Sequence, residues 1–296
     1  MVKRDELLDR YAVLCDREPD GQALTLMDRM RGGFYRTRST RSGGMLEVEA
    51  YPMLPPAARA KLRNTKATSE AQANLNRRNA EKRFRRMAEI NFRDEQDYYF
   101  TGTIEEREDV LLPTLDEVEK IFARFIRRVN YHRKKLGFPN AKYLAVIEGY
   151  EENSRQKRLH CHLLIEGGPG RDTMEKLWTE GMAQCRRLVK AKLDEVCSYL
   201  MKDPRGRKRW KYSKGNLEQP VVTYADRKIS ANAAWRVARD VAGRAAALER
   251  LYPGYKIDGD VEVRSNPYIP GAYIYARLRR KETKNERRAR KRRWKT

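Results

Sequence analysis

The middle of the chain alternates between short strand-like runs and longer stretches with helical spacing. Three runs rich in apolar, aromatic or β-branched residues are predicted strands: residues 98–104, 143–147 and 158–165. Between the first two runs, apolar residues recur every three or four positions from Leu115 to Val129, which predicts an amphipathic helix. Two adjacent antiparallel strands with helices packed on one face predict an α+β sandwich of ferredoxin-like character.

Two capping patterns mark where the predicted helices begin. Thr114 and Glu117 have the spacing of a capping box at the start of the first helix. Asp172 and Glu175 have the same spacing, and they predict a second helix that runs with breaks to Met201. The predicted order of the core is therefore strand, helix, strand, strand, helix.

Basic segments surround this core and indicate the domain boundaries. Residues 1–94 are predicted to form a basic, partly helical arm, whose helix Ser69–Ile90 carries too few large apolar side chains to bury a wide face. That helix is either solvated or bound to an acidic partner such as nucleic acid. Residues 95–280 are the predicted folded domain, in which 205–280 either complete the sheet or form an added DNA-binding piece. Residues 281–296 are a predicted basic tail.

Charge and cysteine usage narrow the functional classes. The 296 residues include 65 Lys and Arg against 41 Asp and Glu, and the formal net charge of +24 attracts polyanions such as nucleic acid. No apolar stretch approaches the ~20 residues that span a bilayer. No P-loop for nucleotide binding occurs. The four cysteines form no C-x-x-C pair, which favours packed thiols in a reducing cytoplasm.

Two of the three histidines lie in the third predicted strand, as His160-Cys161-His162. Residues two apart in a strand point to the same face, so both imidazoles can bind one divalent cation. If the preceding strand pairs with this one antiparallel, Glu148 lies opposite His160 and supplies a carboxylate. Two imidazoles and a carboxylate suit Mn²⁺ or Mg²⁺ together with a phosphate oxygen. The alternative is a pair of structural histidines beside a surface acid.

A tyrosine and a lysine near the end of the late helix are candidates for nucleophilic chemistry. Tyr199 and Lys202 are three residues apart, so their side chains are neighbours on one helix face. A phenol with a pKa near ~10 is a poor nucleophile alone. A nearby ammonium helps to hold the phenolate, and a metal ion polarises the phosphorus under attack. Because exposed tyrosine beside lysine is common on helices, the pair gains weight only from the preceding histidines.

His160-Cys161-His162 followed by Tyr199-Leu200-Met201-Lys202 resembles the HUH endonuclease pattern of rolling-circle replication initiators. The segment Phe100-Thr101-Gly102-Thr103 resembles the first motif of that family. The similarity is greatest to the phage branch, which includes the gene II proteins of filamentous phages and the initiators of small single-stranded DNA phages. The resemblance covers roughly Thr65 to Met201.

The resemblance implies a fold and a mechanism. A five-stranded antiparallel sheet would carry the metal ligands His160, His162 and Glu148, and Mn²⁺ or Mg²⁺ would polarise a phosphodiester of single-stranded DNA at a replication origin. Tyr199 would attack the phosphorus, form a 5′-phosphotyrosine link and release a 3′-hydroxyl primer. Lys202 would help to position the metal ion or offset phosphate charge. The phosphotyrosine bond would conserve the energy for rejoining, so no ATP would be needed.

The resemblance also implies a subtype and partners. The tyrosine follows the histidines, as in replication initiators, and Asp203 occupies the position of a second tyrosine, which implies a one-tyrosine enzyme. The implied partners are single-stranded origin DNA and the host replication helicase or polymerase, with no membrane. The implied location is the cytoplasm of a bacterial host cell.

A basic run with interleaved aromatic residues follows the late helix. The residues expected to contact DNA there are Arg205, Arg207, Lys208, Arg209, Trp210, Lys211 and Tyr212. For the aromatic residues, ordinary packing is the alternative. Two other functions stay open at this point: a non-catalytic basic protein that binds nucleic acid, and a transposase of the HUH superfamily.

Overall fold

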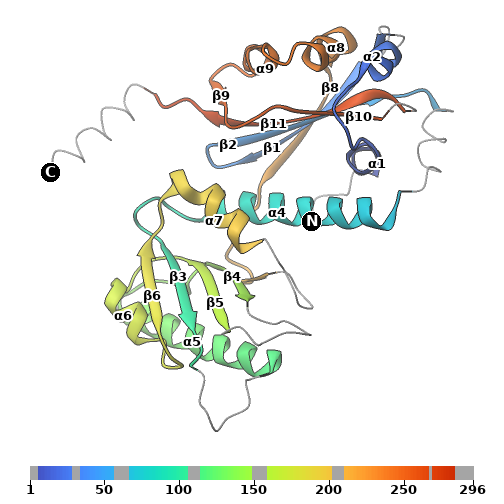
Figure 1. Ribbon diagram of the computed structural model, residues 1–296. Helices are drawn as coiled ribbons and strands as arrows, with labels where there is room; N and C mark the ends of the chain where they lie inside the picture. Colours follow the sequence, from blue (N-terminus) through green and yellow to red (C-terminus); the bar gives the residue numbers. More distant parts are fainter. Residues whose placement is uncertain are drawn as a thin grey trace. The chain divides into compact units, whose positions relative to one another are not determined.

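The computed structural model describes residues 6–28, 34–56, 67–105, 114–148, 159–201, 210–266 and 269–283. These residues form an α+β fold with two antiparallel sheets (Figure 1). The chain divides into two compact units, the first comprising residues 1–77 and 220–296 and the second residues 78–219. Among the described helices, none combines the length and the apolar character needed to cross a membrane.

The first unit contains a six-stranded sheet built from both ends of the chain. Its strands are β1 (Phe34–Ser42), β2 (Met45–Met53), β8 (Val221–Ser230), β9 (Tyr255–Ile257), β10 (Glu262–Asn266) and β11 (Ile269–Arg280). The order is β10-β11-β2-β1-β8, and β9 also pairs with β11. Hairpin strands β1 and β2 therefore lie between strands that come from the other end of the sequence.

Helices cover both faces of this sheet. The helices of the unit are α1 (Glu6–Leu14), α2 (Gly21–Asp28), α8 (Ala231–Arg239) and α9 (Arg244–Leu251). Val237 of α8 and Leu248 of α9 pack with Val48 in one apolar cluster. On the other face, Tyr11 of α1 packs with Tyr273 of β11. In Figure 1, α2, α8 and α9 accordingly lie on one side of the sheet and α1 lies on the other.

This unit differs from the predicted boundaries at 94/95 and 280/281. Residues 34–53, placed in the arm by the sequence, form a central hairpin, and 221–280 belong to this unit rather than to the sheet that carries the histidines. The strand signal is weak because β1 has few apolar residues and β2 turns two acids inward. Buried Glu47 and Glu49 accept hydrogen bonds from Tyr275 and Tyr273, at 2.7 and 2.8 Å, which makes their burial tolerable.

The second unit contains a five-stranded antiparallel sheet of order β6-β3-β5-β4-β7. Its strands are β3 (Tyr98–Thr103), β4 (Tyr143–Glu148), β5 (His160–Ile165), β6 (Ala183–Arg187) and β7 (Lys211–Tyr212). The three predicted strands are confirmed. Strand β7 shows that the first part of segment 205–280 joins this sheet.

Strand β6 corrects the prediction of one broken helix from Asp172 to Met201. The segment instead contains helix α6 (Arg171–Lys176), strand β6 and helix α7 (Leu193–Leu200). The predicted capping box at Asp172 does not form, because Gly170 is the N-cap. The Glu175 carboxylate accepts a hydrogen bond of 2.7 Å from the backbone N–H of Cys185 in β6. Pairing with β3 thus overrides the helical preference of the sequence.

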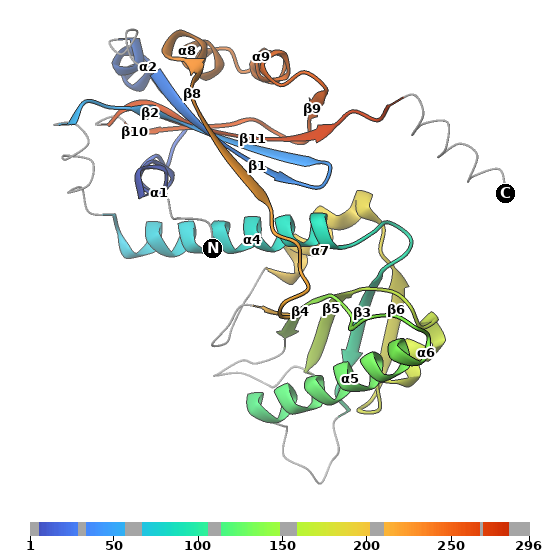
Figure 2. The same cartoon turned by 180° about the vertical axis from the view of Figure 1, so that it is seen from behind.

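Helices pack on both faces of the five-stranded sheet, and not on one face as predicted (Figure 2). Helix α5 (Leu115–Lys135) begins at the predicted capping box, and its Phe125 packs on Phe100 of β3. On the opposite face, Phe84 of α4 (Ser69–Asn91) and Cys197 of α7 pack over Leu164 of β5. Helix α4 therefore buries an apolar stripe despite its many basic residues.

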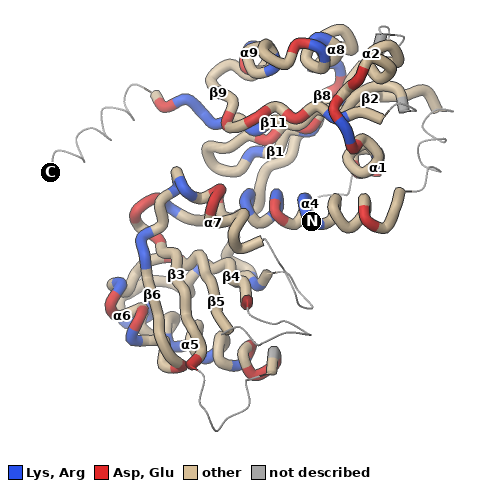
Figure 3. The backbone as a smooth tube through the Cα atoms, in the orientation of Figure 1, with Lys and Arg blue, Asp and Glu red and all other residues tan. Residues whose placement is uncertain are grey.

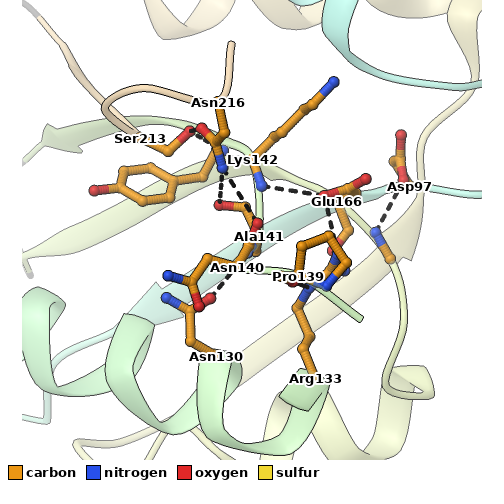
Figure 4. Close-up of polar contacts among 12 residues, drawn as sticks. Asp97, Asn130, Arg133, Pro139, Asn140, Ala141, Lys142, Glu166, Ser213 and Asn216 are labelled. Atoms are coloured by element: carbon orange, nitrogen blue, oxygen red, sulfur yellow. Dashed lines mark hydrogen bonds and ion pairs between the residues drawn. The ribbon is translucent and has the colours of Figure 1, made fainter. Parts of the chain in front are cut away.

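A buried arginine ties the end of α5 to the strands that carry the histidines and Glu148 (Figure 4). Arg133 is 1% exposed, and its Nε donates to the carbonyl of Pro139 at 2.8 Å. Its two terminal nitrogens donate to Glu166, at 3.2 Å to the carbonyl and 2.9 Å to the carboxylate. The backbone N–H of Lys142, just before β4, donates to the same carboxylate at 3.2 Å. The network therefore fixes the start of β4 against the end of β5.

Candidate active site

One face of the five-stranded sheet carries three of the predicted site residues. Strands β4 and β5 pair antiparallel, with Glu148 opposite His160 and Val146 opposite His162. The predicted register is therefore confirmed. Because alternate residues share a face, Glu148, His160 and His162 project to the same side of the sheet, the side covered by α4 and α7.

The two histidines and the carboxylate form a row across β5 and β4. The imidazole rings of His160 and His162 lie 5.9 Å apart at 26°. The Oε2 atom of Glu148 lies 3.3 Å from Nε2 of His162. His162 is 6% exposed, whereas a quarter of the Glu148 side chain is accessible. The carboxylate is thus the more exposed member of this contact.

Helix α7 brings Tyr199 to this row. Leu193, Cys197 and Leu200 are buried and hold the helix on the sheet, while Tyr199 is 53% exposed. The ring centroids of Tyr199 and His162 are 5.7 Å apart, and the rings are perpendicular. Residues 37 positions apart along the chain therefore meet, and the phenol stays accessible to a large ligand.

Strand β3 contributes hydroxyl groups that the sequence analysis did not assign to the site. Thr103 Oγ1 lies 3.0 Å from Nδ1 of His160, and both Thr101 Oγ1 and the Tyr99 hydroxyl lie 3.1 Å from Nδ1 of His162. Burial, with a smaller contribution from the Tyr199 phenol, raises the pKa of Tyr99 to about 12, so its hydroxyl stays protonated near neutral pH. The period-two pattern of residues 98–104 could have identified these three hydroxyls.

The donor atoms on this face are of the types that Mn²⁺ and Mg²⁺ accept. Within the part of the chain that the structure describes, however, no three His, Cys, Asp or Glu side chains are grouped closely enough to hold a metal ion. Glu148 instead contacts His162 directly. The residue types therefore fit a metal ion, and binding would require this contact to rearrange.

Comparison with protein families gives one match to this region. Residues 97–204 match the family model of the replication-associated proteins, which is named for ORF2 and the gene II protein. This segment, called the Rep-matched segment below, includes β3, β4, β5 and α7, and hence every site residue described above. The match supports a function in DNA replication and binding to nucleic acid. Comparisons with curated proteins and with solved structures give no match.

Most of the remaining predicted site residues lie outside the described part of the chain. They are Lys202, Arg205, Arg207, Lys208 and Arg209. Trp210 packs edge-on against Phe84 at 5.4 Å, which gives it a packing role. Tyr212 pairs with Leu144 and is exposed on the site face. Lys211 forms an ion pair with Glu119 of α5 and therefore points to the opposite face.

Two polar side chains of edge strand β6 were also missed by the sequence analysis. Gln184 pairs with Thr101, and Arg186 pairs with Tyr99, so both project to the site face, and both are exposed. The neighbouring strands β3 and β5 of the Rep-matched segment contain no Lys, Arg, Asp or Glu (Figure 3). Arg186 therefore supplies positive charge beside an uncharged part of the face. A helix prediction for this segment concealed it.

Proposed function

We propose that this protein is a rolling-circle replication initiator that nicks and rejoins single-stranded DNA at an origin by HUH-type transesterification. The observation that carries the proposal is the perpendicular contact of Tyr199 with His162, beside His160 and Glu148, inside the Rep-matched segment. An accessible phenol next to paired imidazoles is the arrangement that a tyrosine nucleophile requires.

In the proposed reaction the hydroxyl oxygen of Tyr199 attacks a backbone phosphorus. A phosphorus–oxygen bond to tyrosine forms, the bond to the 3′ oxygen breaks, and the phenolic proton is lost as the 3′ oxygen gains one. The products are a 5′-phosphotyrosine and a free 3′-hydroxyl, and the reverse attack rejoins the strand. A divalent ion held by His160, His162 and Glu148 would polarise the phosphodiester when bound. Lys202 remains a predicted partner of the phosphate.

Several finer assignments of the proposal rest on the resemblance of the sequence. These are a phage-type initiator with one catalytic tyrosine, Mn²⁺ or Mg²⁺ as the ion, a cytoplasmic location, and host helicase or polymerase as partners. The surplus of Lys and Arg supports binding to the DNA backbone, because each neutralised phosphate releases counterions. Binding of that kind does not depend on the sequence of the DNA.

A covalent-adduct assay tests the proposal. The full chain is incubated with Mn²⁺ and a randomised single-stranded oligonucleotide library labelled at the 3′ end, and denaturing gels are used to detect labelled protein. Because the protein joins the 5′ phosphate, the 3′-labelled product stays attached to it. Wild type should form the adduct, and Tyr199→Phe should not.

The control is Tyr131→Phe, which alters a 59% exposed tyrosine on α5, the helix that covers the opposite face of the sheet. It should form as much adduct as wild type. Absence of an adduct with wild type, or equal adduct from Tyr199→Phe, would leave a non-catalytic protein that binds nucleic acid. In that case the histidine row would be structural.

A further inference from the structure

The Thr-Gly-Thr sequence of β3 mirrors the His-Cys-His sequence of β5. The two strands pair antiparallel, with Thr101 opposite His162 and Thr103 opposite His160. Each threonine hydroxyl contacts Nδ1 of the histidine directly across the ladder, at 3.1 and 3.0 Å. The pairing follows from register alone, because residues two apart on both strands face the same side.

The strand order explains which nitrogen each neighbour contacts. Strand β5 lies between β3 and β4 in the sheet. For His162, Nδ1 faces the hydroxyls of β3, whereas Nε2 faces the Glu148 carboxylate of β4 at 3.3 Å. An imidazole held at Nδ1 cannot flip about its χ2 angle without breaking that hydrogen bond. The β3 hydroxyls thus determine that Nε2 is directed toward Glu148.

Packing alone does not account for threonine at these positions. Gly102, between them, faces the other side of the sheet, where an added Cβ would lie 2.7 Å from the Trp178 ring, so its identity follows from packing. Thr101 and Thr103 are only partly buried, and valine has the same shape and a similar strand preference. What threonine adds is a hydroxyl. A hydroxyl can donate to an unprotonated Nδ1 or accept from a protonated one, so it holds the ring in either tautomer.

We propose that Thr101 and Thr103 are positioning residues that hold the His162 and His160 imidazoles with Nε2 toward the Glu148 side of the sheet. Tyr99 is the second hydroxyl on His162, and its ring is nearly parallel to the imidazole at 6.0 Å. The part of this inference that concerns a metal ion rests on the proposed function. Hydroxyls behind ligating histidines typically change metal affinity 10–100-fold when removed, because they fix ring orientation and tautomer.

The test uses Thr101→Val, Thr103→Val and Tyr99→Phe in the full chain, with Thr101→Ser and Thr103→Ser as conservative replacements that keep the hydroxyl. The matched control is Thr223→Val, an exposed strand threonine of the first unit. The first readout is the ¹⁵N NMR spectrum of the imidazoles without metal, which is simple because the chain has three histidines. The second readout is Mn²⁺ affinity without DNA, by titration with electron paramagnetic resonance detection.

The valine variants should shift the ring ¹⁵N resonances of the facing histidine and weaken Mn²⁺ binding about 10–100-fold, while the serine variants should stay close to wild type. Thr101→Val combined with Tyr99→Phe should affect His162 more than either change alone, because two hydroxyls contact its Nδ1. If a valine variant does not fold, Tyr99→Phe and the serine variants still report on His162.

Two results separate this inference from the proposed function. If folded valine variants keep wild-type ¹⁵N shifts and wild-type Mn²⁺ affinity, the positioning role is wrong, whether or not wild type nicks DNA. If wild type forms no DNA adduct but the valine variants shift the imidazole resonances, the hydroxyls still position the histidines and only the nicking reaction is refuted.

Discussion

Replacing Arg133 with methionine should destabilise the second unit by about 3 kcal/mol. Methionine keeps much of the buried aliphatic stem but removes three hydrogen bonds, to Pro139 and to the carbonyl and carboxylate of Glu166. Removing one partner of a buried ion pair typically costs ~3–5 kcal/mol. We expect the lower end, because the Glu166 side chain is 17% exposed and keeps its hydrogen bond from the backbone of Lys142.

Differential scanning calorimetry of the full chain measures this effect. At ~2–4 °C per kcal/mol for a protein of this size class, the transition of the second unit should fall by about 6–12 °C. Lys134→Met, at the neighbouring exposed position, is the control and should change stability by less than ~0.5 kcal/mol. A melting temperature of Arg133→Met indistinguishable from that of Lys134→Met would refute the reasoning, because the buried guanidinium would then contribute nothing net.

Three further predictions concern the site face and the thiols. His160→Ala should abolish DNA adduct formation while leaving salt-dependent DNA binding within a few fold of wild type; loss of binding in a filter assay would contradict this. Arg186→Ala should weaken single-stranded DNA binding and reduce the slope of log affinity against log salt by about 0.7, as expected for one phosphate contact, whereas Arg127→Ala on α5 should not change the slope, as measured by fluorescence anisotropy. Burial raises the pKa of Cys161 and of Cys185 to about 12, so both thiols stay protonated at pH 8; native protein should resist iodoacetamide, and labelling detected by mass spectrometry without unfolding would be inconsistent with the burial.

The parts of the site that could be predicted from sequence are those set by local periodicity. His160 and His162 share a face because a strand has a period of two, and Glu148 lies opposite His160 because a short connection makes the two strands antiparallel neighbours. The contact of Tyr199 with His162 follows from no local rule. Its prediction depended on the family resemblance, and the structure brings the two rings together.

The parts that could not be predicted depend on pairing between distant residues. Strand β1 pairs with β8 although almost two hundred residues separate Arg36 from Asp226, and no local pattern indicates which segment will be its neighbour. Strand β6 has the composition of a helix and becomes a strand through its ladder with β3. The hydroxyls of Tyr99, Thr101 and Thr103 acquire their role only when β3 lies beside β5.

The interleaved order of the sheet in the first unit has a consequence for biosynthesis. Strands β1 and β2 leave the ribosome long before β8 and β11, their partners on either side, whereas residues 78–219 are contiguous and emerge together. Domains tend to fold as units while the chain is still being made. The second unit can therefore acquire its structure on the nascent chain, while the N-terminal hairpin waits for the last strands to be translated. A ribosome stalled after residue 219 would display a completed histidine site beside an unfinished sheet.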